Sequence, residues 1–334
     1  KSTNLGIEIG LFKKIDIQAD FFQQNRTNIL QDRSQVPSSL GLQAPLRANL
    51  GEVSSRGFET TLEYNESFNN GLWLSVRGNF TYATNKFEVF EELDFVGAGL
   101  PWKSRVGNNI DQPYGLIAER LFIDQADIAN SPMQMFGDYL AGDIKYKDIN
   151  NDGVIDTNDE VAIGHPTTPE IIYGFGASAG YKNLDFSLFF QGSARSSFFI
   201  DALNTAPFID TSPDKIGNNA LLQVWADNHW SEDNRDSYAQ WPRLSDQVVD
   251  NNNRPSTWFL KSGDFLRLKS VELGYTIEGK AIMEKANINN LRFYFSGTNL
   301  LTFSKFKLWD VEMGGNGLGY PIQKVFNIGA NINF

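Results

Sequence analysis

The last nine residues of the chain alternate in polarity almost without fault. Alternate positions carry Phe326, Ile328, Ala330, Ile332 and Phe334, and the positions between them carry Asn327, Gly329, Asn331 and Asn333. A strand turns successive side chains to opposite faces of its sheet, so one face of this segment is apolar and the other polar. Such a strand, ending on an aromatic residue, is typical of the wall of an outer-membrane β-barrel, between lipid and lumen.

The composition agrees with this interpretation without proving it. No stretch approaches the ~18 consecutive apolar residues that a membrane helix needs. Hydrophobic residues make up only 41% of the chain, as expected where half of each strand faces water. The 13% of aromatic residues, including 26 Phe, suits the aromatic girdles of a barrel and equally suits any β-rich core.

Charge and rare residues exclude several classes of function. The net charge of −11 argues against nucleic-acid binding, which needs a basic face. The only histidines, His165 and His229, are far apart in sequence and offer little material for acid–base chemistry. No nucleophile–base arrangement is evident, so we expect no enzyme. The absence of cysteine fits a cytosolic protein and an envelope protein equally well.

Nine segments carry strand signals of roughly the length that spans a membrane, ~9–11 residues or slightly more. They are Asn4–Leu11, Ile15–Gln23, Arg56–Glu66, Leu72–Asn85, Glu170–Lys182, Leu184–Ser196, Asp264–Glu278, Asn290–Phe303 and Ile322–Phe334. Phe189 breaks the alternation of its segment, and the phase changes near Ser270, which predicts a β-bulge there. The predicted fold class is therefore all-β, an antiparallel transmembrane β-barrel.

The connections between these segments differ in length. Phe12–Lys14, Ser67–Gly71, Asn183 and Gly279–Asn289 are short, whereas Gln24–Ser55, Lys86–Pro169, Ser197–Gly263 and Ser304–Pro321 are long. Short periplasmic turns and long extracellular loops are the outer-membrane pattern. The alternation works if Tyr114–Phe122 and Ile144–Tyr146 are strand-like pieces within the loop over residues 86–169.

A water-soluble β-sandwich is the alternative to this arrangement. It does not predict two loops as long as 86–169 and 197–263 on one side of the sheet. Nine strands are too few to close a barrel around several loops, and no signal peptide opens the chain. We therefore expect this chain to be the C-terminal piece of a longer polypeptide.

Residues Asp148–Asp159 fit the twelve-residue calcium loop. Side-chain oxygens fall at positions one, three, five, nine and twelve, and Val154 supplies a carbonyl at seven; the candidate ligands are Asp148, Asn150, Asp152, Val154, Asp156 and Asp159. Gly153 permits the sharp turn at position six, and aspartate at position twelve has a shorter reach than glutamate. We predict a structural Ca²⁺ here, and the alternative is a solvated loop of Asx turns.

Four tryptophans, Trp225, Trp230, Trp241 and Trp258, lie in the 197–263 loop. As stacking platforms, they would contact a sugar substrate or a partner protein. The alternative is that they pack the loop against itself. The glycine-rich run from Gly314 to Gly319 has no strand-then-helix context for phosphate binding, so it is interpreted as a flexible loop.

Several motifs occur in order along the chain. They are Trp241–Leu244, Ser256–Tyr275, Asn299–Phe303 and the glycine-rich stretch that ends at Tyr320-Pro321, together with Asp143–Gly164 and Gly192 after Phe189-Phe190-Gln191. In this combination the chain resembles the C-terminal barrel of SusC-type (SusC/RagA) TonB-dependent outer-membrane transporters.

The resemblance implies a 22-stranded barrel, of which these nine strands are the last nine. It implies a plug and a TonB box in an N-terminal part outside this chain, through which TonB would act. It also implies a SusD-like lipoprotein partner and active import of glycan oligosaccharides or peptides across the outer membrane of a Gram-negative bacterium. Two alternatives remain: a non-transporting adhesin or scaffold barrel, and a soluble calcium-stabilised carbohydrate-binding domain.

Overall fold

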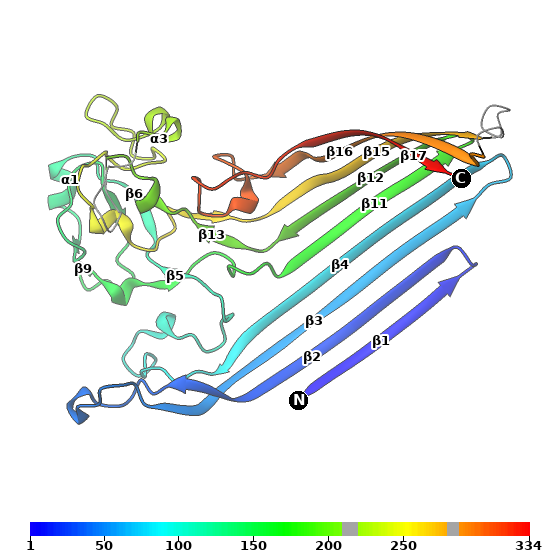
Figure 1. Cartoon of the computed structure of the whole chain (residues 1–334). Helices are drawn as coiled ribbons and strands as arrows, with labels where there is room; N and C mark the ends of the chain where they lie inside the picture. Colours follow the sequence, from blue (N-terminus) through cyan, green and yellow to red (C-terminus); the bar gives the residue numbers. More distant parts are fainter. Residues whose placement is uncertain (209–219, 279–286) are drawn as a thin grey trace.

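One antiparallel sheet of nine long strands dominates the structure (Figure 1). The computed structural model describes residues 1–208, 220–278 and 287–334. The strands lie side by side in chain order: β1 (Ser2–Leu11), β2 (Ile15–Asp32), β3 (Arg47–Ser67), β4 (Leu72–Val89), β11 (Ile171–Tyr181), β12 (Leu184–Ala194), β15 (Phe265–Glu278), β16 (Asn290–Ser304) and β17 (Val325–Asn333). They correspond to the nine segments that alternation predicted, so the all-β, antiparallel fold class is confirmed.

The β2–β3 hairpin is longer than the sequence suggested. A loop was expected over residues 24–55, but β2 continues to Asp32 and β3 begins at Arg47, so only residues 33–46 connect them. The extension carries polar side chains on both faces, which hides the period of two. It is held instead by cross-strand pairing, with register shifts between Arg26 and Ile29 and between Ile29 and Leu30. In Figure 1 this ribbon projects beyond the rest of the sheet.

The tight turns lie together at the end of the sheet where the chain also ends (Figure 1). Between β1 and β2, Phe12 and Lys13 both have positive φ, 55° and 56°. Two consecutive residues in the left-handed region are typical of a type I′ turn, and the Lys14 N–H closes it by donating to the Leu11 carbonyl at 3.0 Å. Of the short connection expected over residues 279–289, residues 279–286 lie outside the described residues. We call this end of the sheet the short-turn end, and the opposite end the long-loop end.

Register makes the sheet two-faced. Directly opposed residues share a face, and one row across the sheet is almost entirely apolar: Ile9, Ile17, Leu62, Gly78, Phe175, Phe190, Leu268 and Leu301. The adjacent row on the other face is mainly polar: Glu8, Gln18, Thr61, Asn79, Gly174, Gln191, Arg267 and Thr302. We call these the apolar face and the polar face.

The apolar face is largely uncovered. Exposed fractions reach 61% at Leu5, 62% at Phe326 and 86% at Ile328. A soluble protein rarely exposes a continuous apolar surface on this scale, and such a surface marks contact with a partner or a membrane. Among the residues described, no helix has the length and apolar character to cross a membrane.

A bulge interrupts the ladder where the alternation changed phase. The β15–β16 register shifts between Leu268 and Ser270, and the β12–β15 register shifts between Phe189 and Phe190. The predicted bulge near Ser270 is therefore confirmed. Phe189 lies on the polar face by the regular alternation of β12, opposite Gly176, and the Arg77 guanidinium lies 5.0 Å from its ring centroid. This cation–π contact explains why an aromatic residue is tolerated on that face.

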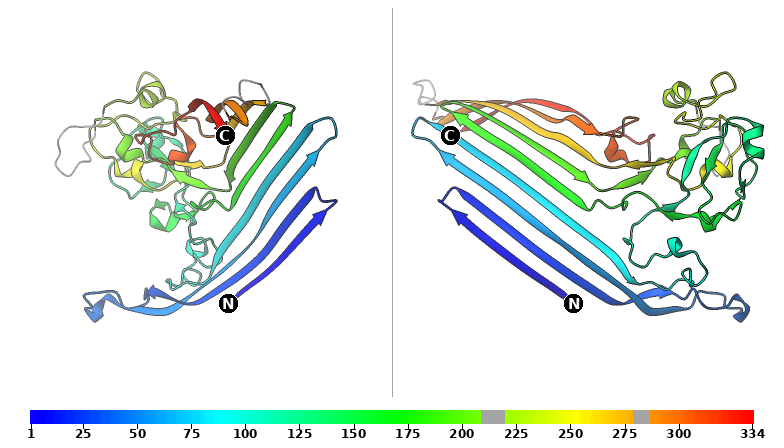
Figure 2. Two further views of the ribbon diagram at one scale, coloured as in Figure 1. Left: turned by 45° about the vertical axis from the view of Figure 1, so that its right-hand side comes forward. Right: turned by 180° about the vertical axis from the view of Figure 1, so that it is seen from behind.

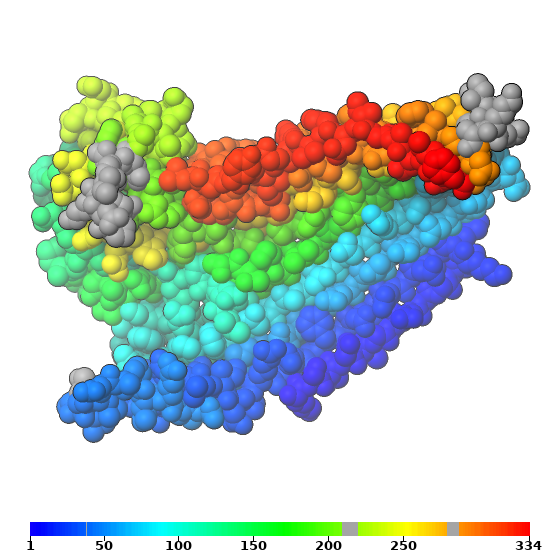
Figure 3. Space-filling view, viewed as in Figure 1, coloured from blue at the N-terminus to red at the C-terminus, as the bar shows by residue number. Residues whose placement is uncertain are grey.

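The described residues of 90–169 and 197–263 form one unit at the long-loop end, which we call the long-loop assembly (Figure 2). Its short elements are β5 (Tyr114–Gly115), β6 (Ala118–Leu121), α1 (Gln125–Ala129), β7 (Met133–Gln134), β8 (Ile144–Tyr146), β9 (Val154–Ile155), β10 (Val161–Ala162), β13 (Ser197–Phe199), α2 (Ala202–Thr205), α3 (Gln223–Asp227) and β14 (Leu260–Ser262). The pieces predicted to be strand-like, Tyr114–Phe122 and Ile144–Tyr146, contain β5, β6 and β8, and β6 pairs with β8. Figure 3 shows the assembly as a continuous mass beyond the ends of the strands.

The hydrophobic core lies in the long-loop assembly rather than in the sheet. Leu116, Leu121 and Ile144 are fully buried there, and Phe306 and Val311 from the β16–β17 connection join the same cluster. This core fixes the long loops over one end of the sheet. The loops are therefore a folded unit, held by the same burial of apolar area that stabilises a small domain.

Candidate functional site

The calcium-type loop is held by hydrogen bonds to its own backbone. The Asp148 carboxylate accepts from the backbone N–H groups of Asn151 (2.7 Å) and Gly153 (2.8 Å). Asp159 is fully buried and accepts from Ile149 (2.7 Å) and Asp156 (2.9 Å). Gly153 has φ +85°, and a Cβ at this position would meet no atom within 4 Å. Glycine is therefore favoured here by the backbone conformation of the turn and not by packing.

The remaining predicted ligands also have partners within the loop. Asp152 accepts from the backbone of Val154 and from the Asn150 amide, both at 2.8 Å, and Asp156 caps the short helical turn Thr157–Asp159. In the described part of the chain, no three histidine, cysteine or acidic side chains are grouped so that they could hold a metal ion. These hydrogen bonds are those expected of the Asx-turn alternative. A carboxylate oxygen that accepts one hydrogen bond keeps a second lone pair that could bind a cation. Calcium at this loop therefore stays a prediction.

The four tryptophans pack within the long-loop assembly. Trp225, Trp230 and Trp241 are 5%, 3% and 0% exposed, and Trp258 packs against the same core. The rings of Trp225 and Trp241 stack with centroids 4.1 Å apart and planes 15° apart. A buried ring offers no free face to a sugar, so this geometry agrees with the packing alternative. Contact of these residues with a substrate or partner stays a prediction.

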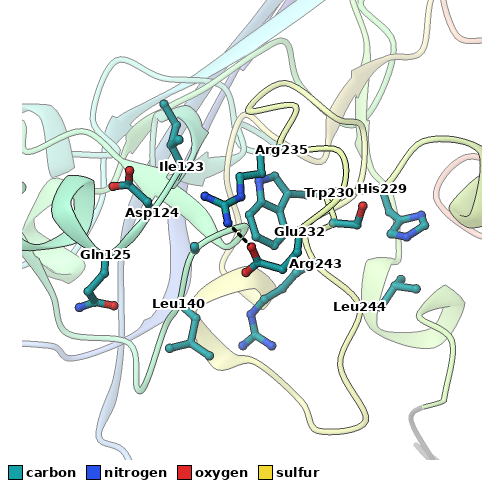
Figure 4. Close-up of a pocket in the computed structure, with 12 residues that line it drawn as sticks. Ile123, Asp124, Gln125, Leu140, His229, Trp230, Glu232, Arg235, Arg243 and Leu244 are labelled. Carbon is teal, nitrogen blue, oxygen red and sulfur yellow. Dashed lines mark hydrogen bonds and ion pairs between the residues drawn. The ribbon is translucent and has the colours of Figure 1, made fainter.

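A cavity of about 630 Å³ opens at the surface of the long-loop assembly. Trp230 forms part of its wall, and Leu140, Glu232, Arg235 and Arg243 surround the opening (Figure 4). The indole of Trp230 lies against Gly142, where any Cβ would meet ring carbons at 2.3 Å. The tryptophan therefore shapes the cavity from behind, while aliphatic and charged side chains face the opening.

Electrostatics at this cavity depend on one buried acid. Asp143 is fully buried and lies 2.9 Å from the Arg243 Nε. Burial raises the pKa of its carboxyl, although the Leu140 backbone and Arg243 act in the opposite direction. The Asn252 amide also donates to it at 2.8 Å. Arg243 is thus fixed by its carboxylate partner, whereas Arg235 pairs with Glu232 at the exposed edge (Figure 4).

A buried polar network joins the two long loops. The Gln134 amide donates to the Asn251 side chain (2.6 Å), and Asn251 in turn donates to the carbonyl of Ile144 (2.8 Å). The Tyr146 hydroxyl donates to the backbone carbonyl of Asn251 (2.6 Å). Because buried polar groups without partners are costly, this network fixes how residues 131–146 sit against 249–254.

Some structurally important residues have no local sequence signal. Arg267 on β15 is 2% exposed and donates to both carboxylate oxygens of Asp310, at 2.6 and 2.9 Å, and its Nε lies 2.6 Å from Glu312. These ion pairs hold the β16–β17 connection over the polar face of the sheet. Further toward the short-turn end, Arg292 pairs with Asp185 and Glu272 on the same face. Strand register brings together the Arg292 cluster, and tertiary packing of the β16–β17 connection brings together the Arg267 cluster.

These features define a class of protein. Nine antiparallel strands, an uncovered apolar face, a polar face with ion pairs, and long loops folded at one end together describe the wall of a transmembrane β-barrel.

Comparison with known proteins agrees with this class. No protein-family model matches the chain. TonB-dependent receptor P26 of Formosa agariphila is 26% identical over a 358-residue alignment that covers 100% of this chain and 34% of that protein. TonB-dependent receptor SusC of Bacteroides thetaiotaomicron is 22% identical, with 92% and 29% covered. The chain thus spans about a third of the length of these relatives.

A solved structure of the RagAB peptide transporter matches all of this chain and 35% of its own, with a TM-score of 0.69 and 21% identity. At that identity the match concerns the fold. Together these comparisons confirm the predicted resemblance to SusC-type TonB-dependent transporters, which extends over the whole of the chain.

Proposed function

We propose that this chain forms part of the barrel wall of an outer-membrane active importer. The observation that carries the proposal is the combination of a two-faced sheet with similarity, over the whole of this chain, to about a third of several TonB-dependent receptors. The apolar face meets lipid, the polar face lines the passage, and the long-loop assembly lies at the extracellular mouth. Energy coupling through TonB requires parts of the protein outside this chain.

The cargo in this proposal is a large nutrient, a glycan oligosaccharide or a peptide, taken up with a SusD-like lipoprotein. The fold similarity to the RagAB peptide transporter supports a peptide as cargo. The glycan and the lipoprotein are what the resemblance to SusC-type transporters implies. The cavity at Trp230 supports a docking role for the long-loop assembly, because apolar and charged side chains together surround its opening. Contact with the lipoprotein or the cargo occurs there.

Uptake in living cells tests the proposal. Cells that carry the full-length gene should accumulate a fluorescent oligosaccharide or peptide from a screened set, and should stop when the gene or the proton-motive force is removed. Uptake that survives energy depletion, with surface attachment lost on deletion of the gene, would instead identify an adhesin or scaffold barrel.

A matched pair of variants tests the docking role. Leu140 lines the cavity and is 53% exposed, whereas Leu42 is 56% exposed and lies far from it in the β2–β3 connection. Leu140→Asp should reduce uptake or recovery of the lipoprotein at least several-fold, and Leu42→Asp should leave both unchanged. If the two variants show equal uptake and equal recovery of the lipoprotein, the cavity is not part of the docking surface.

A further inference from the structure

Two hollows adjoin each other on the apolar face of β2, β3 and β4. One, of about 470 Å³, is lined mainly by the apolar side chains of Leu5, Phe21 and Phe58. The other, of about 580 Å³, is mainly polar and extends under residues 107–112 and 164–170. Gln23, Arg56 and Tyr82 line both hollows. An apolar groove and a polar pocket are therefore continuous at these residues.

The strand register shows that both hollows belong to the same face. Leu5, Phe21, Phe58 and Tyr82 are opposed in one row across β1 to β4. The next row on that face, toward the long-loop end, is Thr3, Gln23, Arg56 and Thr84. The face thus changes from apolar to polar within one step of two residues. If this face meets lipid, as the proposed function states, the change marks the border between acyl chains and headgroups.

Of the basic side chains that line the polar hollow, Lys86 and Arg195 have ion-pair partners, and Arg56 differs from them. Lys86 Nζ lies 3.1 Å from Glu88, and Arg195 Nε lies 2.7 Å from Glu170, whose carboxylate also accepts from the Thr84 hydroxyl. Arg56 is exposed and has no ion-pair partner among the residues that the structure describes. Its guanidinium lies where the two hollows meet and can bind a phosphate through two parallel N–H groups.

We propose that this site holds a lipid with an anionic phosphate headgroup. One acyl chain lies in the groove of Leu5, Phe21 and Phe58, and the phosphate contacts Arg56 at the entrance to the polar pocket. The side-chain amide of Asn25 in that pocket offers hydrogen bonds to the rest of the headgroup. A soluble anion would leave the apolar groove empty, so the paired hollows favour an amphiphile.

Lipid-dependent fluorescence quenching tests this site. In a cysteine-free background of the full-length protein, a fluorophore is placed by Ala19→Cys, two residues from Phe21 on the same face. The protein is reconstituted in phosphatidylcholine vesicles with increasing phosphatidylglycerol, and either lipid carries brominated chains. A basic residue at a membrane surface favours an anionic lipid about fivefold, so brominated phosphatidylglycerol should quench with about fivefold higher apparent affinity.

The preference should fall to near one in Arg56→Gln and persist in Arg47→Gln, because Arg47, on the same strand, is paired with Asp32 at 2.7 Å outside both hollows. Equal quenching by the two lipids in the wild type, or a preference that survives in Arg56→Gln, would overturn the proposal. Loss of the preference in millimolar inorganic phosphate would show that the site binds a free phosphate anion and not a lipid.

A second label, at Phe186→Cys on the apolar face, reports contact with either lipid. Absence of quenching there would contradict the proposed function itself.

Discussion

The loop Asp148–Asp159 depends on individual carboxylates. Replacing Asp159 by alanine removes the acceptor for the N–H groups of Ile149 and Asp156 in a fully buried place. An unsatisfied buried donor costs about 1–3 kcal/mol, so Asp159→Ala should speed amide exchange at 149 and 156. Asp152→Ala, at an exposed position, serves as the control and should have little effect on these two amides. Equal exchange in the two variants would contradict this role.

Calcium binding by the same loop predicts a different response. Chelation should increase proteolytic cleavage within residues 148–159 of the wild-type protein several-fold, because a bound ion would tie the carboxylates together. Asp148→Ala should cleave quickly with or without a chelator. If chelation leaves the wild-type cleavage rate unchanged, the loop is held by its hydrogen bonds alone.

Within the long-loop assembly, buried hydrogen bonds connect the two long loops, so we expect the loops to gain or lose stability together. Asn251 is fully buried and bridges Gln134 to the carbonyl of Ile144. Asn251→Ala should cost roughly 1–3 kcal/mol and raise hydrogen exchange in both loops together. Asn253→Ala, which removes one partly buried bond to Val249, should affect only its own segment. Exchange confined to residues near 251 in the first variant would argue against the linkage.

A pH dependence also belongs to this element. Hydrogen bonds from Arg120, with further help from Ile123 and Lys145, hold the pKa of Asp127 well below its usual range. A lowered pKa contributes stability above the unfolded value of about 3.9, and that contribution is lost as pH falls toward the folded pKa. The stability difference between wild type and Asp127→Asn, measured by hydrogen exchange, should be constant above about pH 5 and shrink below about pH 4. A difference that grows on acidification would contradict this assignment.

The elements also show how far the sequence could lead. Period-two alternation is a local signal, so Leu72–Asn85 and Leu184–Ser196 predicted β4 and β12 closely. The outer part of β2 has polar residues on both faces and no such signal, and only its pairing with β3 reveals it.

Long-range contacts were out of reach for the same reason. Arg267 and Asp310 are 43 residues apart, and their ion pair follows from tertiary packing rather than from any motif. The four tryptophans were visible as a group, but only the fold shows three of them buried in one core.

At the scale of the whole molecule, apolar area is distributed in an unusual way. The loops bury their hydrophobic side chains in a shared core, whereas the sheet leaves one face of nine strands uncovered. Such a surface is stable only against lipid, detergent or a partner. The full-length protein should therefore require detergent for extraction and aggregate when it is removed. A soluble monomer without detergent would favour the calcium-stabilised carbohydrate-binding domain instead.

The central claim is that the nine strands separate lipid from an aqueous passage. A cysteine scan along β12, in the middle of the sheet, tests it most directly in full-length protein reconstituted into vesicles. Labels at Leu184, Phe186 and Leu188 should be quenched by brominated lipid, and labels at Asp185 and Ser187 should react instead with a water-soluble quencher. An alternating pattern with a period of two is the predicted result. Uniform access of the water-soluble quencher to all five positions would contradict the account.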